Sequence, residues 1–68
     1  MRTLADELPR QQARCRTILE HALELPPQSG GFLVAMLRRS LSAAEIAAAS
    51  GDLAAMVRAC ADLQEYKE

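Results

Sequence analysis

The segment Leu41–Leu63 constrains the fold of this chain more than any other stretch of its sequence. It contains two alanine-rich helical patterns that are interrupted once, at Ser50-Gly51-Asp52. Alanine has the highest helix propensity and glycine one of the lowest, and an aspartate directly after the break is a favourable helix cap. The pattern predicts two helices joined by a sharp turn at Gly51, with Asp52 as the cap of the second.

The residues before this segment predict a further helix. Proline is accepted in a first helical turn, so this helix is expected to begin near Pro9 and to end at Pro26-Pro27, since consecutive prolines stop a helix. Its predicted core face consists of apolar residues at helical spacing, namely Leu8, Cys15, Ile18, Leu19, Ala22 and Leu25.

The middle of the chain predicts a turn over Pro26–Gly31 and then a second helix that opens at Phe32, with Ser29 as its cap. Whether this helix is continuous is left open, because Ser42 and Glu45 have the spacing of a capping box that could start a new helix. The last helix, after Asp52, has a predicted core face made of Leu53, Met56, Val57, Cys60 and Leu63. The fold class is therefore all-α, with three helical segments in one domain, residues 1–68.

The chain is short for an independent core. A domain near 60 residues buries only about 60% of the surface that its unfolded chain exposes, and much of the apolar content here is alanine. Self-association, with a homodimer favoured, is the expected support. The predicted oligomer interface lies in a segment that is apolar on every side and consists of Phe32, Leu33, Met36 and Leu37.

The charge pattern argues against a general attraction to nucleic acid or membranes, because the formal net charge is −1. No signal sequence opens the chain and no apolar run approaches the roughly 20 residues of a membrane span, so a cytoplasmic location is expected. The arginines gather in the first half of the chain. We expect the polar contact surface for a partner to consist of Arg10, Arg14, His21, Arg38 and Arg39.

A DNA-binding helix-turn-helix is the sharpest motif match. Glu45-Ile46-Ala47, followed after three residues by Gly51, reproduces the spacing of its first helix and turn. However, Asp52 and Leu53 stand where the motif prefers an aliphatic and a capping residue, and the segment from Ser42 onward is acidic. Because DNA affinity depends on neutralising phosphates, DNA binding is the less favoured alternative.

The sequence also contains residue types of two further kinds of site. Ser29, Gly30 and Gly31 could form an anion cradle at a helix N-terminus, with Arg39 as an additional donor, which would suit a small anionic nucleotide. Catalysis is not expected, because Cys15 and His21 are six residues apart and point about 240° from each other on a helix. No cofactor or metal site is predicted, since two cysteines and one histidine are too few for structural zinc.

Three segments resemble a family of small helical accessory proteins carried by temperate, often Mu-like, phages and prophages. They are Leu8–Arg16, Gly31–Met36 and the stretch from Ser50 through Ala59, and the chain departs from the family at Pro26-Pro27 and at Ser42–Ala44. The resemblance implies a non-enzymatic protein that binds and inhibits a host protein, such as a transcription regulator or quorum-sensing receptor. Other small phage proteins of this kind resemble anti-CRISPR proteins or sponges for signalling nucleotides.

Overall fold

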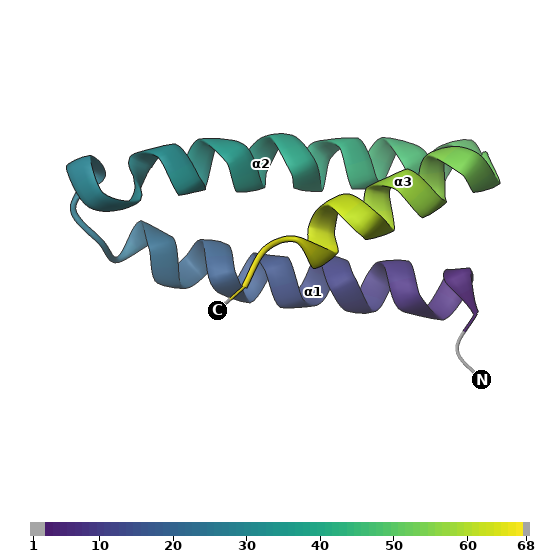
Figure 1. The fold of residues 1–68 in the computed structure, drawn as a ribbon, viewed down its shortest axis with the longest axis horizontal. Helices are drawn as coiled ribbons and strands as arrows, with labels where there is room; N and C mark the ends of the chain where they lie inside the picture. Colours follow the sequence, from purple (N-terminus) through teal and green to yellow (C-terminus); the bar gives the residue numbers. More distant parts are fainter. Residues whose placement is uncertain (1–2, 68) are drawn as a thin grey trace.

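Three helices make up the fold. A computed structural model describes residues 3–67, with helices α1 (Leu4–Leu23), α2 (Pro27–Ser50) and α3 (Leu53–Gln64). Figure 1 shows α1 and α2 side by side and antiparallel along the long axis, while α3 crosses at an angle from the end of α2 back towards α1. Each helix packs against both of the others. The predicted all-α class and the helical hairpin across Gly51 are confirmed.

Helix α1 begins earlier than the sequence predicted. Thr3 caps it, since its side-chain oxygen accepts a hydrogen bond from the amide of Asp6 at 3.3 Å. Asp6 and Glu7 therefore lie within the first turn, where negative charge complements the helix dipole. Pro9 lies inside the helix rather than at its start. Its missing N–H removes one hydrogen bond near the N-terminus, and the cap at Thr3 sets the beginning.

The connection between α1 and α2 is shorter than predicted. Helix α1 ends at Leu23 and α2 begins at Pro27, so the second proline opens a helix instead of ending one. The amides of Ser29 and Gly30 both donate to the carbonyl of Pro26, at 2.8 and 2.9 Å. Ser29 is thus inside the first turn of α2, and the prediction of Ser29 as a cap is wrong.

Helix α2 is one continuous element of 24 residues. It passes without a break through Ser40–Ser42, so the capping-box spacing of Ser42 and Glu45 does not start a new helix. It ends at Gly51, whose φ of 71° lies in the left-handed region that favours glycine. The carboxylate of Asp52 then accepts hydrogen bonds from the amides of Ala54 and Ala55, as predicted for the cap of α3.

The core is narrow and built largely from small side chains. It comprises Leu8, Cys15, Ile18, Leu37, Leu41, Ala44, Ala47, Ala59, Cys60 and Leu63. Leu37 has no exposed surface, so its prediction as an oligomer-interface residue is wrong. Leu53 and Val57, predicted for the core of α3, are 68% and 56% exposed. The inward face of α3 is instead centred on Ala59, Cys60 and Leu63.

Candidate protein-binding groove

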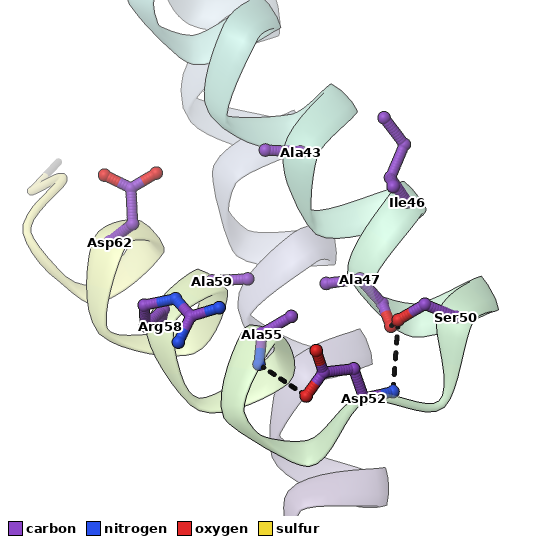
Figure 2. Close-up of a pocket in the computed structure, with 9 residues that line it drawn as sticks. All are labelled: Ala43, Ile46, Ala47, Ser50, Asp52, Ala55, Arg58, Ala59 and Asp62. Atoms are coloured by element: carbon purple, nitrogen blue, oxygen red, sulfur yellow. Dashed lines mark hydrogen bonds between the residues drawn. The ribbon is translucent and has the colours of Figure 1, made fainter.

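A groove of about 500 Å³ lies between α2 and α3. Its floor is made of four alanines, Ala43 and Ala47 from α2 and Ala55 and Ala59 from α3, which Figure 2 shows on the facing sides of the two helices. We call these four residues the alanine floor. Each helix contributes its pair at i,i+4 spacing, so both alanines of a pair share one face. The sharp turn at Gly51 holds the two helices close together. Because methyl groups fill little space, a hollow remains above the floor.

The rim of this groove combines an exposed aliphatic side chain with polar ones. Ile46 rises beside the floor from α2, and Arg58 and Asp62 extend from α3. The Arg58–Asp62 spacing is suited to an i,i+4 ion pair, yet within residues 3–67 neither side chain has a salt bridge. Both charges therefore remain accessible to an incoming group.

The closed end of the groove is occupied by the turn itself. The hydroxyl of Ser50 donates to the carbonyl of Ala47 at 2.8 Å and accepts from the amide of Asp52 at 3.1 Å. Because Asp52 also caps α3, the polar groups at this end already have partners. These hydrogen bonds link the end of α2 to the start of α3.

The groove continues along the outer face of α2. We call this face the α2 stripe; its residues alternate by four and three positions and are Phe32, Met36, Arg39, Ala43, Ile46 and Ser50. Two further hollows, of about 290 and 280 Å³, lie along it beside Met36 and Arg39. Phe32, Met36 and Ile46 are 79%, 42% and 68% exposed. This spacing is that of a helix face which packs against another helix.

The predicted interface residues divide between this surface and the core. Phe32 and Met36 lie on the α2 stripe, as a contact surface requires. Leu33 is half-buried and packs against the core, whereas Leu37 is part of the core itself. The predicted interface therefore mixed exposed and buried residues, because a helix that is apolar all round carries no sign of which side turns inward.

Arg14 has a structural role that the sequence did not reveal. Its guanidinium donates to the carbonyl oxygens of Leu63 and Tyr66, each at 2.7 Å, and so caps the C-terminal end of α3. Gln11 accepts from Nε of Arg14 at 2.9 Å, and Gln11 in turn donates to the carboxylate of Glu7. The guanidinium of Arg14 is therefore already engaged within the chain, which does not favour its predicted role as a partner contact.

The other predicted contact residues do not share one face. Arg10 is exposed and forms a salt bridge with Glu7 at 3.1 Å. Arg39 lies on the α2 stripe, whereas Arg38 precedes it by one residue and so points about 100° away. His21 lies on α1 beside a different hollow. Of the five, Arg39 is the one that lines the groove system along α2.

The predicted anion cradle lacks its expected donors. The amides of Ser29 and Gly30 are used by the first turn of α2. Gly30 is buried, and a Cβ there would stand 2.7 Å from the carbonyl oxygen of Ala22, so this glycine permits close packing of α1 and α2. Gly31 is exposed and has open space around it.

An apolar hollow that the sequence did not predict lies beside His21. Its volume is about 250 Å³, and its lining is Ile18, His21, Ala22, Leu25, Leu33 and Lys67. These residues come from α1, the loop after it, α2 and the C-terminal end. No local sequence pattern joins such distant segments, so no signal could have indicated it.

The two thiols are poorly suited to nucleophilic chemistry. Burial raises the pKa of the Cys15 thiol, which also donates to the carbonyl of Leu63 at 3.4 Å, and burial raises the pKa of Cys60. A thiol held protonated in apolar surroundings is a weak nucleophile. Among residues 3–67, no group of three or more histidine, cysteine or acidic residues is arranged to hold a metal ion. No helix in the same range is long and apolar enough to cross a membrane.

The geometry around Gly51 also bears on the helix-turn-helix alternative. The helix before the turn has 24 residues, and only Gly51 and Asp52 separate it from α3. Arg58 is the one basic residue of α3, and it lines the groove together with Asp62. A recognition helix needs several cationic or polar side chains directed at DNA, and α3 does not present them.

Comparison with known proteins gives no match to any family model, curated protein or solved structure. The resemblance to phage accessory proteins therefore depends on the three sequence segments alone.

Proposed function

We propose that this chain is a non-enzymatic interaction protein that binds a helix of another protein in the groove between α2 and α3. The observation that carries the proposal is the α2 stripe, on which Phe32, Met36 and Ile46 are exposed in one row beside the alanine floor. Exposed apolar rows mark interaction sites. Amphipathic helices dock into grooves through anchors at i, i+3, i+4 and i+7.

The chemistry of the groove sets the kind of helix that fits. The alanine floor accepts bulky aliphatic or aromatic anchors, because its methyl groups leave room above them. Arg39, Arg58 and Asp62 supply both signs of charge along the rim. A partner helix should therefore present large apolar residues on one face, flanked by charged residues of both signs.

The class of partner follows from the resemblance. Small phage accessory proteins bind and inhibit host proteins, so the proposed target is a host protein with an accessible amphipathic helix, such as a transcription regulator. Inhibition would follow if that helix were needed for the target's own contacts. Arg39 is the predicted contact residue that remains part of this surface.

Site-specific photocrosslinking in cells tests the proposal. A photoreactive phenylalanine analogue replaces Ala43 in the groove, and the same analogue replaces the exposed Ala13 on α1 as the control. We expect a specific heterologous protein to be crosslinked from position 43 and not from position 13. Ala43→Glu should abolish its capture by the tagged protein, while Ala13→Glu should leave it intact. Equal crosslinking from both positions would refute the groove as the binding site.

A further inference from the structure

We propose that a second copy of this chain occupies the groove in the isolated protein, through antiparallel pairing of the two α2 helices about a two-fold axis near Leu41. The inference rests on the proposed function, since it names a partner for the same face. In this arrangement Phe32 lies opposite the partner's Ser50, Met36 opposite the partner's Ile46, and Arg39 opposite the partner's Ala43. A host target would then have to displace the second copy.

Side-chain size supports this pairing. In each pair of facing residues, a large side chain of one copy lies against a smaller or branched side chain of the other. Phe32 of each copy comes to the end of the groove where the partner's Ala47 and Ala55 form the alanine floor. The most exposed aromatic side chain thus meets a part of the same surface whose floor consists of methyl groups. A two-fold contact of this kind must be complementary to itself, and this stripe is.

Charge supports the antiparallel direction. Arg39, Ala43 and Asp62 line the same hollow, yet within residues 3–67 the two charged side chains form no salt bridge with each other or with another group. Placing Arg39 over the partner's Ala43 brings it beside the partner's Asp62, and the symmetry produces this ion pair twice. A parallel pairing would place the two copies of Arg39 against each other, which is repulsive.

The extent of the surface is also adequate. The α2 stripe from Phe32 to Ser50 is about 27 Å long at 1.5 Å per residue, and the groove adds a second helix width of about 10 Å. A stable interface covers about 800 Å² per partner, which is roughly a sixth of the 4698 Å² of accessible surface. A contact along the whole stripe and across both helices is of this order.

Mass measurement in solution, by light scattering or native mass spectrometry, is the first test. We expect the measured mass to be twice that of the 7.4 kDa chain at micromolar concentration. Arg39→Asp and Asp62→Arg should each weaken the dimer Kd at least tenfold, and the double variant should recover most of the loss. Ala13→Glu should have no effect. A folded monomer at 100 µM, or no recovery in the double variant, would overturn the proposal.

Disulfide trapping tests the register separately. Variants Met36→Cys and Ile46→Cys should form a mixed disulfide when combined under mild oxidation, while neither should crosslink to itself. Native Cys15 and Cys60 are buried and give little background. Efficient self-crosslinking of either variant would indicate parallel pairing and overturn the model of the dimer. A monomer that still crosslinks a host protein from position 43 would overturn this inference and leave the proposed function standing.

Discussion

Arg14 and Leu63 connect the first helix to the end of the third. Nη2 of Arg14 donates to the carbonyl oxygen of Leu63 at 2.7 Å, and the thiol of the adjacent Cys15 donates to the same oxygen at 3.4 Å. The last turn of a helix leaves carbonyls without intrahelical donors. The half-buried guanidinium of Arg14 donates to the Leu63 carbonyl of this last turn and to the Tyr66 carbonyl just beyond it, and this holds α3 against α1.

Removing this cap should destabilise the protein. We expect Arg14→Ala to lower the free energy of unfolding by about 1.5–3 kcal/mol, because hydrogen bonds that involve a charged group have this range. Arg14→Lys should recover only part of the loss, since an ammonium lacks the guanidinium's fork of donors. Urea unfolding followed by circular dichroism measures both. The control is Arg10→Ala, an exposed salt bridge expected to contribute less than about 1 kcal/mol. Equal losses for Arg14→Ala and Arg10→Ala would contradict the capping role.

The hydroxyls of Ser40 and Tyr66 should be energetically coupled. They lie 2.9 Å apart, and Ser40 is buried on α2 while Tyr66 follows α3. We expect Tyr66→Phe to cost about 1 kcal/mol, because it leaves the Ser40 hydroxyl without this partner. A double-mutant cycle with Ser40→Ala should give a coupling energy of at least about 0.5 kcal/mol. Additive losses would show that the contact contributes nothing.

The two neighbouring glycines of α2 should respond to alanine in opposite directions. Gly30→Ala places a Cβ 2.7 Å from the backbone oxygen of Ala22, so α1 and α2 must separate. We expect a loss of about 1–3 kcal/mol, as for other overpacked sites. Gly31→Ala meets open space on a helix and should stabilise the protein by about 0.4–1 kcal/mol. Thermal unfolding of the two variants measures the sign of each stability change. A Gly31→Ala variant that is less stable than the original protein would contradict the helical start at Pro27.

The buried thiols should make stability fall at alkaline pH. Burial raises the pKa of Cys15 and of Cys60, so the folded state keeps protons that the unfolded state releases. Their contribution is complete below an unfolded thiol pKa of about 8.5 and is lost as pH rises through the raised folded values. Urea midpoints between pH 7.5 and 9.5 should decline, and less steeply in Cys60→Ala. Native thiols should also react with maleimide far more slowly than in denaturant at pH 8. Fast native alkylation would refute their burial.

Much of the fold follows from local sequence signals. Gly51 and Asp52 place the turn and the cap of α3 where they were predicted, because left-handed backbone and side-chain capping depend on residues within one turn of each other. Cys15 and Ile18 on α1, and Cys60 and Leu63 on α3, are buried as their spacing indicated. The errors at Pro9 and Ser29 are boundary errors, where Thr3 and Pro27 were the stronger helix starts.

The candidate site was less predictable. The sequence predicted a contact surface around Phe32 and Met36 but not the alanine floor, because alanines at i,i+4 spacing carry no sign of whether they lie in a core or beneath a groove. Arg39 and Asp62 line the same hollow but come from different helices, α2 and α3. Neither helix alone carries that signal.

Local sequence signals are sufficient to predict that this chain forms helices, that it turns at Gly51 and which side of α1 faces the core. Packing of the three helices sets which side of α2 faces inward, with Leu37 in the core and Phe32 outside. It also makes Arg14 the cap of α3, through hydrogen bonds to Leu63 and Tyr66. These residues follow Arg14 in the sequence by 49 and 52 positions. Helix propensity and capping act over about one turn of chain. Burial and long-range hydrogen bonds depend on which helices meet, and that is settled by packing of the whole chain.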